Sequence, residues 1–283
     1  MGEYMELYRL ETIKQIMSKK GLKFNKALGQ NFLTRQDYLL DIISGAKVDS
    51  DSIVMEIGPG LGSLTQELAR IAKKVIAIEL DRGLVVVLKE LFFEQENVEI
   101  IQGDCLKVDL NEIIGDNHVK IVANLPYYIT TPIIMKVLEE VRNIESMTVM
   151  VQKEVAQRMV ASAGGKEYGA LSLAVQYHAD AEIILNVPAD AFVPPPKVDS
   201  AVVHLEILKQ KRVATPGDIF FKAIKSAFSQ RRKTLVNALV GSRMYDKSKD
   251  EIRRIITGIG LDENIRGERL SLEQFAILAE KLG

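Results

Sequence analysis

Short apolar runs alternate with amphipathic segments through the first half of the sequence, and this alternation constrains the fold more than any other feature. Four runs have the length and composition of buried strands, at residues 53–57, 75–79, 98–101 and 119–123. Between them, apolar residues recur at helical spacing, at Leu64, Leu68 and Ile71 and again at Leu84, Leu88 and Leu91. Strands and helices in alternation predict a parallel sheet with crossover helices, which is an α/β fold.

The following stretch predicts that more strands complete this sheet. A fifth strand is expected at 147–151, after a helix that begins near Pro132. Two further strands, at 181–187 and 201–207, flank the proline-rich stretch Phe192-Val193-Pro194-Pro195-Pro196. The α/β architecture is therefore expected to continue to about residue 207.

A change of architecture is expected close to residue 210. Around residues 209–212 the composition turns polar and basic, and Thr215-Pro216 is typical of a helix start, with Thr as N-cap. Further helices are expected at 248–258 and 271–282. We therefore predict an α/β domain over residues 1–210 and a small all-helical domain over residues 211–283.

A glycine-rich turn follows the first strand and opens the next helix. Its sequence, Gly58-Pro59-Gly60-Leu61-Gly62, is followed by Ser63, where the dinucleotide fingerprint G-x-G-x-x-G needs a third glycine. The pattern present is G-x-G-x-G, with an acidic residue two positions before it. It resembles the S-adenosylmethionine (SAM) site of Rossmann-like methyltransferases, whose cofactor has no pyrophosphate to place at a helix N-terminus.

Acidic residues stand at the ends of the second and third strands, on the edge where open α/β sheets bind ligands. Glu79 ends the second strand, and a carboxylate there can accept hydrogen bonds from both ribose hydroxyls of either SAM or NAD. Asp104 follows the third strand and can accept from an adenine amino group, although an aspartate there is also an ordinary turn former. Polar groups at several strand ends together indicate a ligand that contains a nucleoside.

The fourth strand ends in Asn124-Leu125-Pro126-Tyr127, which resembles the (Asp/Asn/Ser)-Pro-Pro-(Tyr/Phe) motif of methyltransferases that modify exocyclic amines. An adenine amino nitrogen is a poor nucleophile because its lone pair is delocalised into the ring. The Asn124 side-chain oxygen and the Leu125 carbonyl can accept its two N–H groups and aim the lone pair at a methyl donor. Pro126 fixes the loop, and Tyr127 offers a stacking face. No strong base is required, because positioning supplies much of the rate; a turn with a buried tyrosine is the plainer alternative.

The composition excludes several other classes of protein. The chain has 283 residues, 47% of them hydrophobic and 27% charged, and contains no apolar run of the roughly 18 residues that a membrane span needs. One cysteine and three scattered histidines offer no spacing of metal ligands. We expect a cytoplasmic monomer with neither a structural metal nor a membrane segment.

Basic residues concentrate in two segments, although the formal net charge is only −1. Residues 12–36 contain six Lys or Arg and no acid, and residues 219–247 contain seven against Asp246 alone. Two basic segments on a nearly neutral chain indicate a polyanionic partner, with solvated helix faces as the alternative.

Together these motifs resemble those of the ribosomal RNA adenine dimethyltransferase family, from about Lys26 to the C-terminus. The matching stretches are LGQNFL (28–33), EIGPGLGSLT (56–65), ELD (79–81), GD (103–104), NLPYYITTPII (124–134), QKEVAQRM (152–159), KEYGALS (166–172), FVPPPKVDSAV (192–202) and QRRKTLVN (230–237). The resemblance implies a Rossmann-like class I SAM-dependent methyltransferase domain followed by the helical domain. It also implies dimethylation at N6 of two adjacent adenosines in the 3′-terminal hairpin loop of 16S rRNA, during maturation of the small ribosomal subunit.

The resemblance also assigns roles to individual residues. Implied contacts of SAM are Asn31, Leu33, Gly58, Gly60, Glu79, Asp104 and Asn124. Implied residues around the target base are Asn124, Leu125, Pro126 and Tyr127, with Phe192 as a second aromatic opposite Tyr127. Implied contacts of the rRNA are Lys222, Lys225, Arg231, Arg232 and Lys233.

Three other functions stay open at the level of the sequence. A large-subunit rRNA adenine methyltransferase of the macrolide-resistance type shares the SAM site and the N-[L/I]-P-[Y/F] loop, but KEYGALS and QRRKTL favour the small-subunit enzyme. A ribosome-assembly factor acting mainly by binding would not need the intact cofactor and Asn-Leu-Pro-Tyr motifs. An NAD-dependent oxidoreductase is disfavoured by Ser63.

Overall fold

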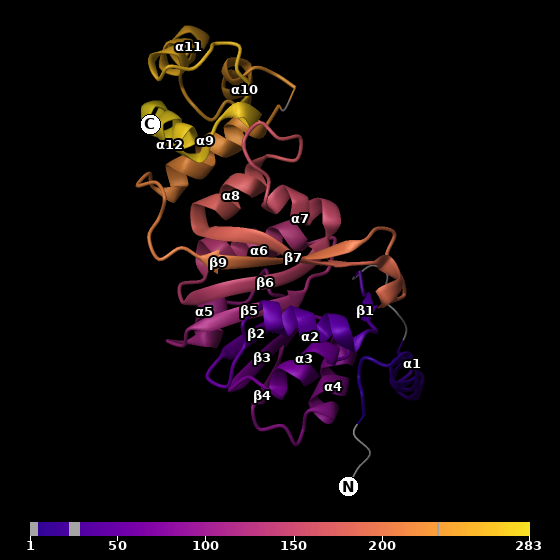
Figure 1. Ribbon diagram of the computed structural model, residues 1–283. Coiled ribbons are helices and arrows are strands. Elements are labelled where there is room, and N and C mark those ends of the chain that lie inside the picture. The colour runs from indigo at the N-terminus through magenta and orange to yellow at the C-terminus, as the bar shows by residue number, and fades with distance from the viewer. Residues whose placement is uncertain (1–4, 23–28, 231) are drawn as a thin grey trace. The chain divides into compact units, whose positions relative to one another are not determined.

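The computed structural model describes residues 5–22, 29–230 and 232–283, and the chain forms two compact units (Figure 1). The sheet unit comprises Met1–Ala156 and Glu182–Ile207, and the helical unit comprises Gln157–Ala181 and Leu208–Gly283. The prediction from sequence divided the chain once, after residue 210. The division seen in the structure differs from this prediction, because residues 157–181 group with the C-terminal helices.

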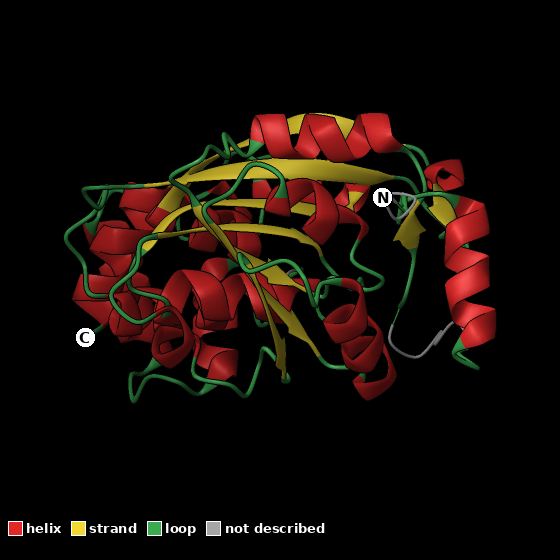
Figure 2. Ribbon diagram, turned by 90° about the horizontal axis from the view of Figure 1, so that it is seen from below, coloured by secondary structure: helices red, strands yellow, loops and turns green. Residues whose placement is uncertain are grey.

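Among the described residues, seven strands form one mixed sheet in the order β4-β3-β2-β5-β6-β9-β7. They are β2 (Ile53–Ile57), β3 (Lys74–Glu79), β4 (Val98–Gln102), β5 (Val119–Asn124), β6 (Ile144–Gln152), β7 (Ala179–Val187) and β9 (Ser200–Ile207). The strands from β4 to β6 pair in parallel, and β9 pairs antiparallel with β6. The predicted parallel sheet is confirmed, and its strands fan out with the usual twist (Figure 2).

The direction in which the sheet grows reverses beside β2. From β2 the chain crosses to β3 and then β4 on one side, whereas β5 returns to pair with the other side of β2. Such a reversal leaves a crevice at the carboxyl ends of the strands, which is where open α/β sheets bind their ligands. The ends of β2, β3, β4 and β5 therefore frame the expected site.

The helices of the sheet unit pack through apolar side chains, and two of them begin at a capping aspartate. They include α1 (Leu10–Lys19), α2 (Gln36–Gly45), α3 (Ser63–Ala69), α4 (Arg82–Leu91), α5 (Leu110–Ile114) and α6 (Thr130–Glu140). The Asp81 side chain caps α4 by accepting from two backbone N–H groups, and Asp109 caps α5 in the same way. Helix α1 buries Ile13 and Met17 in a cluster that also contains Leu88 of α4. This packing fixes the N-terminal helix beside the glycine-rich turn.

A pair of two-residue strands, β1 (Phe32–Leu33) and β8 (Phe192–Val193), joins two distant parts of the sheet unit. They pair antiparallel, and next to them both the backbone N–H and the hydroxyl of Thr34 donate to the carbonyl of Ala191, each at 2.9 Å. Neither strand was expected from the sequence, because each is too short to show a period of two. The pairing holds the segment before β2 against the proline-rich segment before β9.

The helical unit has its own hydrophobic core. Its helices are α8 (Ala170–His178), α9 (Gly217–Phe228), α10 (Leu235–Ser242), α11 (Lys249–Gly258) and α12 (Leu272–Leu282), and α7 (Lys153–Met159) crosses the boundary between units. Tyr168 and Tyr177 are fully buried in this core, where Tyr177 stacks on Phe220 at 4.8 Å between ring centroids. The Tyr168 hydroxyl donates to Leu270 O and the Tyr177 hydroxyl to Thr215 O. These contacts explain why residues 157–181 belong to this unit.

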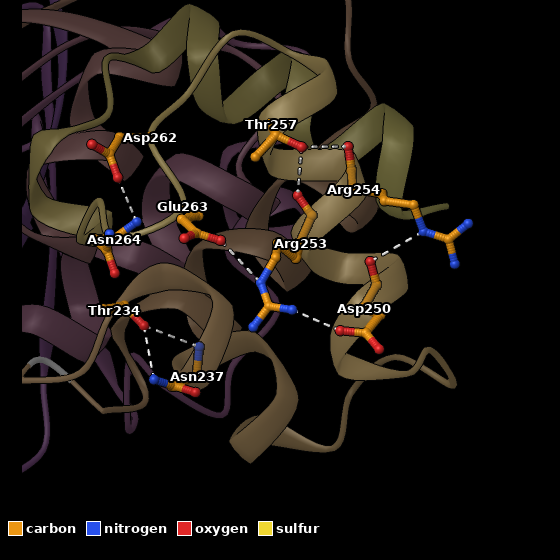
Figure 3. Close-up of polar contacts among 9 residues, drawn as sticks. All are labelled: Thr234, Asn237, Asp250, Arg253, Arg254, Thr257, Asp262, Glu263 and Asn264. Carbon is orange, nitrogen blue, oxygen red and sulfur yellow. Dashed lines mark hydrogen bonds and ion pairs between the residues drawn. The ribbon is translucent and has the colours of Figure 1, made fainter.

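Two details of the helical unit differ from or extend the prediction. Pro216 rather than Thr215 is the N-cap of α9, and the Thr215 hydroxyl instead donates to Glu280 Oε1 at 2.7 Å. On α11, Arg253 forms ion pairs with Asp250 at 2.7 Å and with Glu263 at 3.1 Å (Figure 3). The charge of Arg253 is therefore offset by two carboxylates.

Candidate active site

A pocket lies at the carboxyl ends of the parallel strands, within the sheet unit. It encloses about 1000 Å³, part of it open to solvent, and its walls come from residues 29–33, the turn after β2 and the ends of β3, β4 and β5. Every residue predicted to contact SAM lines it: Asn31, Leu33, Gly58, Gly60, Glu79, Asp104 and Asn124. The structure thus brings the predicted cofactor residues together, while their individual roles stay predictions.

The glycine-rich turn has a backbone that only glycine adopts without strain. Gly58 and Gly60 have φ of 71° and 63°, in the left-handed region. A Cβ on Gly60 would lie 2.8 Å from the ring of Phe32. Glycine here therefore allows β1 to close over the turn and leaves the backbone open to a ligand.

Two buried carboxyl groups face the pocket. Glu56 is 1% exposed, and its Oε2 accepts from the Thr65 hydroxyl at 2.6 Å. Burial raises the pKa of Glu56 to about 8, and the neighbouring carboxyl of Glu79 adds to the rise. Burial also raises the pKa of Glu79, although its oxygens accept from the backbone N–H groups of Gly60 at 3.2 Å and Asp81 at 2.8 Å. A cationic ligand beside them would stabilise the ionised form of both carboxyl groups.

The electrostatics of the pocket favour a cation over a pyrophosphate. Its lining contains the carboxyl groups of Glu56, Glu79 and Asp104, and none of the described residues that line it is Lys, Arg or His. SAM carries a sulfonium and an ammonium group, whereas NAD carries two phosphates that would face these carboxyl groups. The lining therefore suits SAM on electrostatic grounds, whereas a dinucleotide would have to bind its phosphates through backbone N–H groups alone.

Asn124 is held in one orientation by the segment before β2. Its Nδ2 donates to Asn31 O at 3.1 Å, and Asn31 Nδ2 in turn donates to Gly29 O at 3.0 Å. This bond assigns the amide, because a carbonyl can only accept. Asn124 Oδ1, which accepts no hydrogen bond from the described residues, is left for an incoming donor.

The rest of the Asn-Leu-Pro-Tyr loop is fixed by backbone and side-chain bonds. Leu125 N donates to Met150 O at 3.1 Å, and Pro126 O accepts from the Thr130 hydroxyl at 3.0 Å. Tyr127 lines the pocket, and its hydroxyl lies 2.5 Å from Ser200 Oγ. The loop therefore presents an amide oxygen and an aromatic ring to the same space.

Phe192 is buried behind residues that line this space. Its side chain is 1% exposed and packs in a cluster with Leu33, Leu39 and Ile42, and it is not among the described residues that line the pocket. The predicted place of Phe192 beside the target base, opposite Tyr127, stays a prediction. In this structure Phe192 pairs with Leu33 between β8 and β1, and both side chains belong to one buried cluster.

Glu56 and Tyr128 are two of the lining residues that were not selected from the sequence. The sequence pattern identifies Glu56 only as the acidic residue before the glycines. A charged residue inside an otherwise apolar strand nevertheless indicates a functional position, because charged side chains are rarely buried without a partner. Tyr128 lines the pocket and is 51% exposed. Its ring packs against Gly29, where an added Cβ would lie 3.4 Å from the Tyr128 ring. Adjacent tyrosines alone do not reveal which ring faces a ligand, so Tyr128 could not be selected.

The predicted RNA contacts lie in the helical unit. Lys225, Arg232 and Lys233 are exposed, and Lys222 Nζ lies 4.5 Å from the centroid of the Tyr245 ring. None of these four forms an ion pair with the residues that the structure describes. Arg231, also predicted, lies outside the described residues.

The described parts of the chain contain no group of metal ligands and no membrane-spanning helix. Within residues 5–22, 29–230 and 232–283, no three His, Cys, Asp or Glu side chains converge as metal ligands would. No helix in these ranges combines the length and the apolar character needed to cross a bilayer.

Known proteins are similar to this chain in sequence and in fold. The model of the ribosomal RNA adenine dimethylase family matches residues 21–281. The chain is 47% identical over 274 residues to ribosomal RNA small subunit methyltransferase A of Alkaliphilus metalliredigens, covering 95% of each chain. A dimethyladenosine transferase from Plasmodium falciparum matches with a TM-score of 0.73 and 29% identity, over 86% of this chain and 94% of that one.

A second solved structure is a large-subunit enzyme. The 23S rRNA methyltransferase ErmE matches with a TM-score of 0.66 and 25% identity, over 89% of this chain and 99% of that one. Both structural matches extend well beyond the seven-stranded sheet of the described residues. They confirm the predicted Rossmann-like methyltransferase fold.

Proposed function

The chain belongs to the ribosomal RNA adenine dimethylase family, and we propose that it dimethylates adenosine N6 in the RNA of the small ribosomal subunit, with SAM as methyl donor. The observation that carries this proposal is the position of Asn124 in a pocket whose described lining residues include three carboxyl groups and no basic side chain, with Asn124 Oδ1 left to accept a hydrogen bond. The name of the Alkaliphilus relative supports the small subunit as substrate. Such a substrate also supports action in the cytoplasm.

The residues of the pocket suit the parts of SAM. Glu79 would accept from the ribose hydroxyls, since each of its oxygens has a lone pair beyond the ones used by Gly60 and Asp81. Asp104 would accept from the adenine amine, and the backbone at Gly58 and Gly60 would lie against the cofactor. When bound, SAM supplies an electrophilic methyl group on a sulfonium.

The Asn-Leu-Pro-Tyr loop would orient the target amine. Asn124 Oδ1 and the Leu125 carbonyl would accept the two N–H groups, which turns the nitrogen lone pair away from the ring and toward the donor. Tyr127 would stack on the base and hold its plane. These groups position the amine rather than deprotonate it before the transfer, and the proton leaves afterward from a cationic product.

The target adenosines are proposed to be the two adjacent ones in the 3′-terminal hairpin loop of 16S rRNA. A base in a loop can be unstacked into a pocket at low cost, which an enzyme acting on an exocyclic amine needs. Lys222, Lys225, Arg232 and Lys233 of the helical unit are proposed to contact phosphates, because no carboxylate of the described residues neutralises them.

The test of this function is methyl transfer from labelled SAM to small ribosomal subunits that lack modification at that hairpin. Large subunits are assayed in parallel, and the products are mapped by mass spectrometry. We expect two adjacent dimethyladenosines on the small subunit alone. Label on the large subunit would instead indicate the activity named for ErmE, and SAM binding without label on either would indicate a binding role.

Reversing two charges on the helical unit should weaken RNA binding. For Arg232→Glu with Lys233→Glu we expect the affinity for the subunit to fall about tenfold or more. The slope of log K against log salt should become shallower by about one to two, because fewer counterions are released. Filter binding between 50 and 200 mM salt measures both quantities.

The matched control reverses two exposed charges on α11, Lys249→Glu with Arg254→Glu, and so changes the net charge equally. It should leave the salt slope closer to that of the wild type. Equal losses in both variants would mean that net charge alone, rather than contacts of Arg232 and Lys233, determines binding.

A further inference from the structure

The hydroxyl of Tyr127 is held by a side chain that lies outside the pocket. Tyr127 Oη lies 2.5 Å from Oγ of Ser200, which is fully buried at the first residue of β9. Ser200 pairs with Gln152 of β6, so the sheet rather than a loop carries its hydroxyl. Ser200 is not among the described residues that line the pocket. It can act on a bound base only through Tyr127.

The backbone on both sides of the Tyr127 ring is already fixed. Pro126 has a restricted φ, and its carbonyl accepts from Ile129 N at 3.2 Å and from the Thr130 hydroxyl at 3.0 Å. The main remaining freedom of the ring is rotation about its two side-chain torsions. The bond from the hydroxyl to Ser200 fixes the far end of the ring axis. Because a phenolic hydroxyl bonds best in the plane of its ring, the same bond also favours one rotation of the ring about that axis.

We propose that Ser200 is a positioning residue that sets the plane of the Tyr127 ring, and through it the plane of the target adenine. This inference rests on the proposed function. Small displacements of a reacting group have large effects on rate, because the amine must lie in line with the methyl group. A ring held at both ends presents one stacking plane, whereas a ring held at its backbone alone presents several.

The two methyl transfers to one adenine depend on the ring to different degrees. In the first transfer, two N–H groups of the amine can bond to Asn124 Oδ1 and the Leu125 carbonyl. In the second, the amine already carries one methyl group and has a single N–H. Stacking on Tyr127 then supplies a larger share of the positioning. Loosening the ring should therefore slow the second transfer more than the first.

The test compares Ser200→Ala, Tyr127→Phe and the double variant on the small subunit, with mono- and dimethyladenosine quantified separately. Each single variant should lower kcat of the first transfer about fivefold to tenfold and of the second by a larger factor, so that monomethyladenosine accumulates. The Kd for SAM should stay unchanged. The double variant should be no slower than either single variant, because both remove one interaction. Ser200→Thr, which keeps a hydroxyl, should restore dimethylation.

A matched control is the hydrogen bond between Thr148 of β6 and His204, which lies four residues along β9 from Ser200. Thr148 Oγ1 lies 2.8 Å from His204 Nδ1, and both side chains are buried between β6 and β9, as Ser200 is. Thr148→Val removes this hydrogen bond and should lower the Tm while leaving the ratio of mono- to dimethyladenosine unchanged.

The outcomes separate this inference from the proposed function. Ser200→Ala and Tyr127→Phe with the product ratio of the wild type would overturn the role of Ser200 and leave the function standing. The wild type failing to methylate either subunit would overturn both. Tyr127→Phe keeps every backbone group and the buried serine, so it remains informative should Ser200→Ala fold poorly.

Discussion

Asn124→Ala is expected to lower kcat for methyl transfer by about 1000-fold or more while the affinity for SAM changes by less than about tenfold. The side chain is proposed to supply Oδ1 to the target amine, and removing it would leave the Leu125 carbonyl as the remaining acceptor from this loop. The bond from Asn124 Nδ2 to Asn31 O at 3.1 Å is lost as well. That loss frees a backbone carbonyl beside the cofactor, where water can replace the donor.

The measurement is single-turnover transfer to the small subunit, with SAM binding followed by calorimetry on the same preparation. Asn117→Ala is the control, because Asn117 Nδ2 likewise donates to a backbone carbonyl, that of Ile114, but Asn117 does not line the pocket. It should transfer methyl groups at the rate of the wild type. Full activity of Asn124→Ala would contradict the proposed role of the amide.

Glu56→Gln is expected to stabilise the protein without SAM and to weaken the binding of SAM. Burial raises the pKa of Glu56 to about 8 from an ordinary value of 4.5. The folded state therefore binds one proton more than the unfolded state between these two values. The stability that the neutral carboxyl provides is complete below pH 4.5 and is lost as the pH rises through about 8. Glutamine stays neutral, so the variant should gain about 1 to 3 kcal/mol at pH 8.5 and little at pH 4.5.

Without SAM the site favours a neutral side chain at position 56. Binding of the cationic cofactor should reverse this preference, because a sulfonium near Glu56 favours the ionised carboxylate. The affinity of the wild type for SAM should rise with pH through about 8, and that of Glu56→Gln should be about tenfold to 100-fold weaker at pH 8.5, with a flatter profile. Thermal unfolding and calorimetry across this range measure both effects. S-adenosylhomocysteine, which lacks the sulfonium, should show the smaller pH dependence.

Glu99→Gln provides the matched substitution at an exposed carboxyl on β4, where the carboxylate pairs with Lys74 at 2.7 Å. It should change neither the pH profile of unfolding nor the affinity for SAM. A gain in stability for Glu56→Gln that is equal at both ends of the range would mean that the carboxyl does not titrate as inferred.

The sequence was sufficient for the sheet and the pocket because both depend on local patterns. Short runs of four or five residues predicted the parallel strands, and the residues at their carboxyl ends meet at one edge whatever the loops do. Gly58, Glu79, Asp104 and Asn124 could therefore be placed together without coordinates. Their convergence followed from strand direction and order alone.

Features that depend on contacts between distant segments could not be predicted in this way. The pairing of β1 with β8 joins Phe32 to Val193 across most of the sheet unit, and neither strand is long enough to show a pattern. The same pairing buries Phe192, which sequence placed beside the target base. The bond between Tyr127 and Ser200 likewise depends on the register of β9 on β6.

The helical unit is discontinuous in the chain, and this order affects how the protein is made. Residues 157–181 leave the ribosome well before the segment that covers them, which begins at Leu208. Until then Tyr168 and Tyr177 lack Leu270, Thr215 and Phe220 as partners. A nascent chain that stops near residue 210 therefore exposes two large aromatic side chains that chaperones and proteases recognise. The core around these two side chains is complete only when the last helix, α12, has left the ribosome.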